Sequence, residues 1–158
     1  MPPKATDIPL TDSAARLRLG IVRTARRLRQ EAAAEASGLT PTSTAALATI
    51  ERHGPLTPSE LAKLERVQRP TVTRTLSCLD REGLIERTPD PADGRSALVS
   101  VNGAGRERLR RLRGRKNAYL ARRMRDMPAT DVEVLERAAE ILEGMLESDD
   151  APARRGRP

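Results

Sequence analysis

The stretch Leu56–Val101, which reads LTPSELAKLERVQRPTVTRTLSCLDREGLIERTPDPADGRSALVSV, contains the signals that decide the fold. Thr57 can cap a helix, Pro58 suits its first position, and Glu60 completes a capping box. This helix is expected to end near Glu65, and the tight turn RVQ follows it. A short capped helix, a tight turn and a second helix are the order of elements in a helix-turn-helix motif.

The second helix of this motif is expected to have Pro70 in its first turn and to end at Gly83. A proline deeper in the helix would break the hydrogen-bond ladder. The 3.6-residue period places the hydrophobic side chains on one, inward face: Val72, Leu76 and Leu79. The residues expected to point away from the core are Arg69, Thr71, Arg74 and Ser77 or Cys78.

A β-hairpin is expected after this helix. LIERT and SALVSV read as short strands, and Asp93-Gly94 between them is a strong signal for a tight turn. Arginine is the usual bidentate reader of a guanine edge in the major groove. An arginine at a hairpin tip can reach the adjacent minor groove, whose negative potential attracts it. Arg74 and Arg95 are therefore candidate DNA contacts, one for each groove.

The chain resembles the MarR-type winged-helix transcriptional regulators from about Asp12 to Ser148. The resemblance rests on the pattern PTVTR…LxxxGLIxRxxxPxDxRxxxVxV within the stretch quoted above. It implies an obligate homodimer with the first and last two helices at the interface. It also implies binding to successive major grooves of a pseudo-palindrome, and repression that small phenolic or anionic ligands often relieve.

The resemblance also implies individual contacts to DNA. A phosphate contact falls on Thr42, the recognition-helix contacts fall on Pro70, Thr71 and Arg74, and the wing arginine is Arg95, steadied by Asp93. The sequence departs from the family pattern at three positions. Gly94 replaces a second basic residue of the wing, which predicts weaker wing binding. Gln68 replaces a common Ser cap, and Asn102 replaces a common Thr cap, a change expected to matter little.

Amphipathic helices flank this region on both sides. The first is expected from a cap at Asp12 or Ser13 to about Ala36, ended by Gly38, and the second from Thr42 to Arg52, closed by Gly54. After the hairpin, Asn102 can cap a long helix that reaches about Met127, and a capping box of Thr130 and Glu133 opens a last helix through Leu146.

These elements give a mainly α fold with a small β-hairpin wing. Residues 39–102 form the expected winged helix-turn-helix domain, and residues 9–38 and 103–148 form a helical dimerisation region. Residues 1–8 are expected to be a disordered arm and residues 149–158 a disordered basic tail. The terminal helices have hydrophobic stripes but almost no aromatic residue to bury, which independently favours a dimer.

Composition supports nucleic acid as the partner. The 158 residues carry a formal charge of +7, with 29 Lys and Arg against 22 Asp and Glu. Such a charge suits an anionic partner such as double-stranded DNA. One Cys and one His exclude an intramolecular disulfide and argue against a His- or Cys-based metal site, and no cofactor is expected. The sequence shows no nucleophile–base pair and no P-loop, so an enzyme is not expected.

The leading hypothesis is a sequence-specific, dimeric, ligand-responsive repressor. No signal peptide or membrane span is apparent, so the cytoplasm is the expected compartment. A DNA-binding regulator without an effector ligand, and a winged-helix adaptor that binds protein instead of DNA, remain as alternatives. Cys78 is read as structural, because a redox sensor needs exposure and a lowered pKa.

Overall fold

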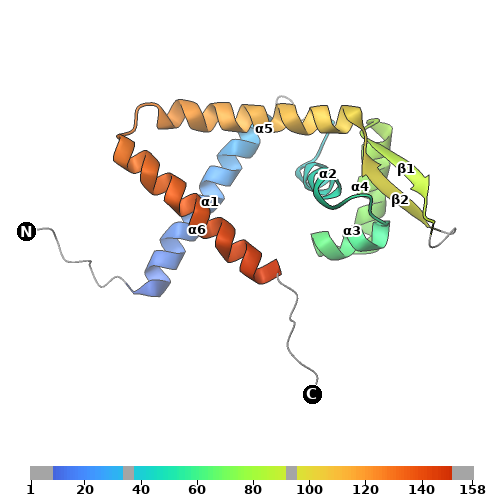
Figure 1. Cartoon of the computed structure of the whole chain (residues 1–158), viewed down its shortest axis with the longest axis horizontal. Coiled ribbons are helices and arrows are strands. Elements are labelled where there is room, and N and C mark those ends of the chain that lie inside the picture. Colours follow the sequence, from blue (N-terminus) through green and yellow to red (C-terminus); the bar gives the residue numbers. More distant parts are fainter. Residues whose placement is uncertain (1–8, 34–37, 92–95, 151–158) are drawn as a thin grey trace, which may run out of the picture. The chain divides into compact units, whose positions relative to one another are not determined.

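The computed structural model describes residues 9–33, 38–91 and 96–150, with the side chains of 147–150 outside that description. The chain divides into two compact units, residues 1–119 and 120–158. The elements, in chain order, are α1 (Leu10–Ala32), α2 (Pro41–His53), α3 (Pro58–Glu65), α4 (Arg69–Arg81), β1 (Ile85–Pro89), β2 (Ala97–Val101), α5 (Gly103–Met124) and α6 (Ala129–Asp150). The expected mainly α fold with a β-hairpin wing is confirmed (Figure 1).

A single hydrophobic core holds the winged helix-turn-helix together. In Figure 1, α2, α3 and α4 gather beside the hairpin and the start of α5. Leu47 and Leu79 have no exposed surface, and Ile50 and Val99 are 1% exposed. Leu109 of α5 belongs to the same core, so the first turns of α5 pack on this domain. Burial of aliphatic side chains is the main force that stabilises such a small core.

The wing is an antiparallel pair in which Ile85 lies opposite Val101 and Pro89 lies opposite Ala97. Leu56, just before α3, adds an isolated bridge to this sheet. Its N–H donates to the Val99 carbonyl at 3.0 Å, and the Val99 N–H donates back at 2.8 Å. The hairpin is therefore tied to the segment that leads into the helix-turn-helix motif.

The start of α5 is fixed by Asn102. Its side-chain amide donates to the carbonyls of Gly83 at 2.9 Å and Ile85 at 3.3 Å, and its side-chain oxygen accepts from the Gly105 N–H at 3.0 Å. The expected cap is confirmed, whereas the expectation that Asn in place of Thr matters little stays a prediction. A Thr hydroxyl has one donor and could not supply both amide bonds.

The structure corrects the expected starts of two helices. Pro9, instead of Asp12 or Ser13, precedes α1, and Asp12 lies in its first turn. Thr130 and Glu133 do not form a capping box, because α6 already begins at Ala129 and the Asp131 and Val132 N–H groups bond to the Pro128 carbonyl. In both cases the carbonyl of the preceding proline accepts the first helical hydrogen bonds, so the helix begins before the polar residue that was expected to cap it.

The start of α2 also differs from the one expected. Thr40 caps this helix, which begins at Pro41 instead of Thr42. The Thr40 hydroxyl accepts from the Ser43 N–H at 3.0 Å, so the cap lies two residues before the expected start.

Four helix ends lie a few residues from those expected. Helix α4 ends at Arg81, two residues before Gly83. Helix α1 ends at Ala32 instead of near Ala36, and residues 34–37 lie outside the described part. Helix α5 ends at Met124, three residues before Met127. Helix α6 continues past Leu146 to Asp150, so the first two residues of the expected tail are helical. The expected arm at 1–8 and the remaining tail at 151–158 lie outside the described residues.

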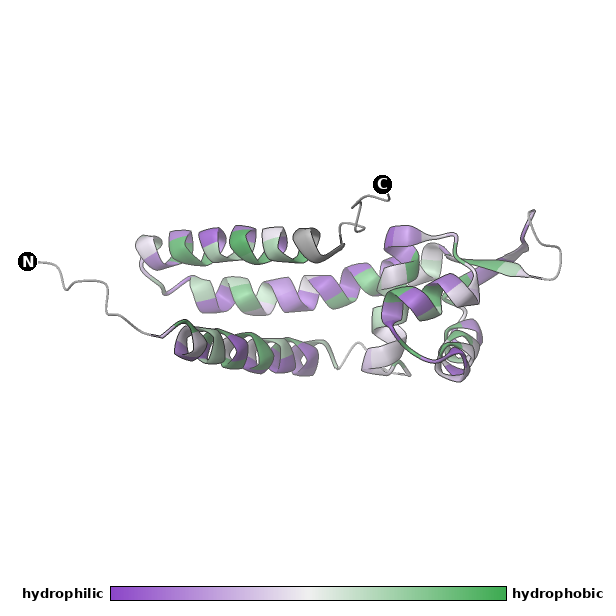
Figure 2. Ribbon diagram, turned by 90° about the horizontal axis from the view of Figure 1, so that it is seen from below, coloured by the Kyte–Doolittle hydropathy of each residue, from purple (hydrophilic) through white to green (hydrophobic). Residues whose placement is uncertain are grey.

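Helices α1 and α6 carry hydrophobic side chains that nothing in their own units buries. Figure 2 shows hydrophobic and hydrophilic residues alternating along both helices. On α1 the exposed hydrophobic residues are Leu10, Leu17, Leu19, Ile21 and Val22, and on α6 they are Val134, Leu135, Ile141, Met145 and Leu146. Within the described ranges, no helix combines the length and hydrophobicity that crossing a membrane requires.

Candidate nucleic-acid interface

The two faces of α4 differ completely in burial. Val72, Leu76 and Leu79 are at most 2% exposed and point into the core, as the sequence pattern predicted. Thr75 is also buried, at 8% exposed, which the hydrophobic pattern alone did not indicate. The expected outward residues Arg69, Pro70, Thr71, Arg74 and Ser77 are all exposed, whereas Cys78 is half-buried.

The first turn of α4 is anchored to α3. The Arg69 guanidinium donates to the Ser59 hydroxyl at 2.9 Å, which joins the first turn of α4 to the first turn of α3. Gln68 supplies no side-chain cap, although its carbonyl accepts from the Thr71 N–H at 3.0 Å. The first turn of α4 thus has no side-chain cap from Gln68, and the expectation that the helix starts less firmly there stays a prediction.

Arg74 is the exposed cation in the middle of this face. Within the described part of the chain, its guanidinium has no ion pair or hydrogen bond with another residue. Its five N–H donors are therefore free to meet an external acceptor, and a planar guanidinium suits the two acceptors of a guanine edge. An exposed cation above a rigidly buried face is the arrangement that groove recognition requires.

The wing is oriented relative to α4 by an ion pair. The Arg87 guanidinium of β1 lies 3.1 Å from the Asp80 carboxylate at the end of α4. The wing residues Asp93 and Arg95 lie outside the described residues, so their contacts to DNA stay predictions. Thr42 is exposed in the first turn of α2, where the predicted phosphate contact also stays untested.

The helix before the turn has the strongest local cap in the motif. The Thr57 hydroxyl accepts from the Glu60 N–H at 3.2 Å, and the Thr57 N–H donates to the Glu60 carboxylate at 2.8 Å. The backbone and side-chain hydrogen bonds from Thr57 lower the pKa of Glu60 below its ordinary value of 4.5. The predicted capping box is confirmed residue by residue, and it fixes where α3 starts.

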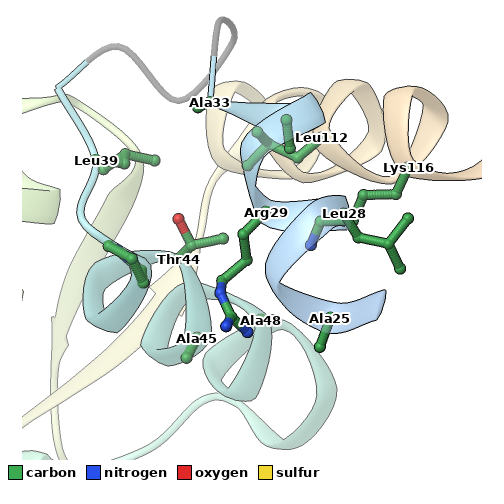
Figure 3. A pocket seen from close by; sticks show the side chains of 12 residues that line it. Ala25, Leu28, Arg29, Ala33, Leu39, Thr44, Ala45, Ala48, Leu112 and Lys116 are labelled. Carbon is green, nitrogen blue, oxygen red and sulfur yellow. The ribbon is translucent and has the colours of Figure 1, made fainter. Parts of the chain in front are cut away.

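A pocket of about 560 Å³ lies between α1, α2 and the middle of α5. Its wall is mostly hydrophobic: Ala25, Leu28, Ala32, Ala33, Leu39, Pro41, Ala45, Ala48 and Leu112. Arg29, Thr44 and Lys116 supply the polar groups, and Figure 3 shows Arg29 extending from α1 toward Ala45 and Ala48 of α2. A ligand pocket is expected where the first and fifth helices meet the winged domain, and this cavity lies there, but the sequence does not identify its lining residues.

Cys78 faces the segment between α1 and α2. Its thiol lies 3.8 Å from the Gly38 carbonyl, a distance for a weak S–H donor. Gly38 has a φ of +85°, and a β-carbon there would come within 2.8 Å of the Glu82 carboxylate. The segment that leads from the pocket wall at Leu39 therefore packs closely on the end of α4.

A family model and the related sequences both indicate a family of transcriptional regulators. Residues 39–97 match the model of the MarR family. An HTH-type transcriptional regulator of Mycobacterium bovis is 33% identical over 147 residues, which span 90% of this chain and 100% of the relative. BadR of Rhodopseudomonas palustris, a transcriptional activatory protein, is 31% identical over 126 residues, or 77% of this chain and 72% of BadR.

Solved structures agree with the sequence relatives. A transcriptional regulator protein of Pseudomonas aeruginosa superposes with a TM-score of 0.76 at 31% sequence identity. The alignment covers 91% of this chain and 98% of that chain, so it includes the long helices as well as the winged domain.

Proposed function

Because the chain belongs to the MarR family of winged helix-turn-helix transcriptional regulators, we propose that it binds a pseudo-palindromic operator as a homodimer. It is a DNA-binding transcriptional regulator, and the finer proposal concerns how it binds and what releases it. Each protomer places α4 in a major groove. A small anionic ligand then relieves repression by binding between α1, α2 and α5.

The observation that carries the proposal is the outer face of α4. Arg69, Thr71 and Arg74 lie exposed on it, above a core that holds the helix at Val72, Leu76 and Leu79. Only such a fixed helix can place a guanidinium accurately enough to distinguish base edges. Thr71 at the N-terminal end suits a phosphate or a thymine methyl group, and Arg74 suits a guanine.

The homodimer is supported by the uncovered hydrophobic faces of α1 and α6. Leu17 and Ile21 on α1, and Ile141 and Met145 on α6, each keep 43% or more of their surface exposed. A soluble monomer rarely exposes so many hydrophobic side chains along two helices. A second copy of the chain covers them with the same residues, and its two-fold axis matches the symmetry of a pseudo-palindrome.

The effector proposal rests on the chemistry of the pocket. A mostly hydrophobic wall with the cations Arg29 and Lys116 suits a small molecule with an apolar body and one anionic group. The same wall includes Leu39, which follows Gly38 and its contact with α4. A ligand that displaces Leu39 would therefore disturb the position of α4 and weaken DNA binding. The direction of regulation is proposed to be repression.

The decisive experiment measures binding to the DNA upstream of the protein's own gene, with random DNA as the comparison, over a range of salt concentrations. Specific binding should exceed random binding by about a thousandfold or more, with a steep salt slope. Arg74→Ala should cost about 1–3 kcal/mol on the specific site and relax base preference at one position. Arg81→Ala, at the far end of α4, is the matched control and should retain the base preference.

A second titration tests the effector. Benzoate should weaken DNA binding of the wild-type chain, whereas uncharged benzamide should not. Arg29→Ala should abolish the benzoate response and leave DNA binding without ligand intact. DNA binding that responds to neither compound would favour a regulator without this class of ligand. Equal, weak binding of the wild type to both DNAs would favour the protein-binding adaptor.

A further inference from the structure

The turn between α3 and α4 has an unusual residue at its tightest point. Arg66 follows the last residue of α3 and adopts the left-handed conformation, with φ of +52° and ψ of +41°. The Val67 N–H bonds to the Ala62 carbonyl at 3.1 Å, and the Arg66 N–H bonds to the Lys63 carbonyl at 3.2 Å. These two bonds define a Schellman motif, in which the left-handed position is usually occupied by glycine.

A side chain at this position opposes folding. In the left-handed region the β-carbon of an L-residue approaches its own backbone, a clash that glycine avoids. Among the described residues, Arg66 is the only non-glycine with a positive φ, while Gly38 and Gly83 adopt it at the other two such positions. The local backbone would accept glycine at residue 66 more readily than arginine, so the side chain needs another explanation.

Among the described residues, the Arg66 side chain has no polar partner that would offset this strain. It is exposed, and in the described part of the chain it forms no ion pair and no hydrogen bond through its guanidinium. The turn is held instead by its backbone bonds and by Val67, which packs against the core. The charge of Arg66 is therefore directed to solvent, three residues before the anchored Arg69.

The position of the turn in a helix-turn-helix motif would bring the Arg66 guanidinium close to DNA phosphates. In a helix-turn-helix the helix before the turn crosses the DNA backbone, and the N-terminal end of the second helix enters the groove. The turn that joins these two ends lies at the edge of the groove, where phosphates are the nearest acceptors. An unpaired guanidinium at this edge suits a phosphate oxygen, because phosphates form strong, charge-assisted hydrogen bonds with arginine.

We propose that Arg66 is a phosphate-binding residue of the helix-turn-helix turn, and that a strained backbone is tolerated there because the cation contributes to DNA affinity. The proposal rests on the DNA-binding function but not on the contacts assigned to α4 or the wing. It places a sequence-independent contact beside the base-reading face, which fixes the depth and register of α4 in the groove.

The test compares four full-length proteins: the wild type, Arg66→Gly, Arg66→Ala and Arg66→Lys. Thermal unfolding measures the effect of backbone strain at residue 66 on stability. DNA binding over a series of salt concentrations measures the contribution of its charge to affinity. Arg66→Gly should unfold at a temperature equal to or a few degrees above the wild type, since glycine relieves the strain. The same protein should bind specific and random DNA more weakly by a similar factor of about five to ten. Its salt slope should fall by about 0.9 for each phosphate that is no longer neutralised.

The other variants separate charge from backbone. Arg66→Lys should bind DNA within about threefold of the wild type, whereas Arg66→Ala should bind as weakly as Arg66→Gly without its gain in stability. Arg81→Ala removes an equal charge from the far end of α4 and should change the salt slope little. Arg66→Gly binding with the affinity and salt slope of the wild type would overturn the inference, and so would a loss equal to that of Arg81→Ala. A wild type that fails to prefer the upstream DNA contradicts the operator proposal instead.

Discussion

The winged domain and helix α6 differ in where their hydrophobic residues lie. In the winged domain Leu47 and Leu79 have no exposed surface, and every element contributes to one core. In α6, Leu146 and Val134 are each 66% exposed, and no described residue of the helix is buried. The winged domain buries its hydrophobic residues within itself, whereas α6 leaves its hydrophobic side chains exposed, which is the surface that the proposed dimer would cover.

The largest expected effect comes from a substitution in the core of the winged domain. Leu79→Ala should lower the free energy of unfolding by about 2–5 kcal/mol, because it leaves a cavity in a fully buried site. Urea unfolding followed by circular dichroism measures the change. Leu146→Ala, measured at a concentration at which the chain is monomeric, should change stability by less than about 0.5 kcal/mol. Equal losses in the two variants would contradict the contrast between the regions.

The next effect tests the surface that needs a partner. Ile141 is 52% exposed on α6, so Ile141→Asp should leave the isolated chain folded but place a charge in the proposed interface. The dissociation constant of the dimer should rise by about a hundredfold, equivalent to about 2.7 kcal/mol. Sedimentation equilibrium measures it, and Ile141→Leu should still dimerise. A wild-type chain that stays monomeric at high micromolar concentration would refute the proposed dimer.

A third prediction tests whether the winged domain includes the start of α5. Asn102 joins the end of α4, strand β1 and the start of α5 through three hydrogen bonds. Asn102→Ala should cost about 0.5–2 kcal/mol, since the Gly83 and Ile85 carbonyls lose a donor and α5 loses its cap. Asn102→Thr should recover the cap but not both amide bonds, and its stability should fall between those of the wild type and Asn102→Ala. Thermal unfolding of the three proteins would show no such order if Asn102 were only a cap.

The smallest effect concerns the capping box of α3. The folded-state pKa of Glu60 lies below its ordinary value of 4.5 because the Thr57 backbone and hydroxyl donate to its carboxylate. A lowered pKa means that this contribution to stability is present above 4.5 and is lost as the pH falls through the folded-state value. The wild type should therefore lose slightly more stability on acidification than Glu60→Gln. Unfolding curves at several pH values check this, and parallel curves would exclude the contribution.

Local signals in the sequence predicted the winged domain well. The capping box at Thr57 and Glu60 involves residues three apart, so nothing outside α3 decides it. The alternation of buried and exposed residues on α4 was equally readable, because one hydrophobic stripe faces one core. The same kind of local signal failed at Thr130, because the Pro128 carbonyl already accepts the first hydrogen bonds of α6, which begins at Ala129. Local sequence patterns therefore identify residues that can start a helix, but not which of two neighbouring candidates does so.

The candidate sites depend more strongly on tertiary structure. Exposure of Arg69 and Arg74 follows from helical period, and the structure places both as expected. The residues that line the pocket could not be predicted from the sequence. They come from three segments, α1, α2 and α5, that meet only in the folded chain. The left-handed conformation of Arg66 was also missed, since the usual glycine signal for it is absent. Conversely, the wing residues Asp93 and Arg95 remain predictions from the sequence alone.

Gly105 determines how closely α5 and the wing can approach each other. A β-carbon at this residue would lie 2.2 Å from the Leu84 carbonyl oxygen and 2.6 Å from a Val101 methyl group. The backbone of α5 at Gly105 therefore lies directly against the Leu84 carbonyl and the Val101 side chain at the base of the hairpin. Any larger residue at position 105 would push the first turn of α5 away from the wing, so this glycine sets the distance between the two elements.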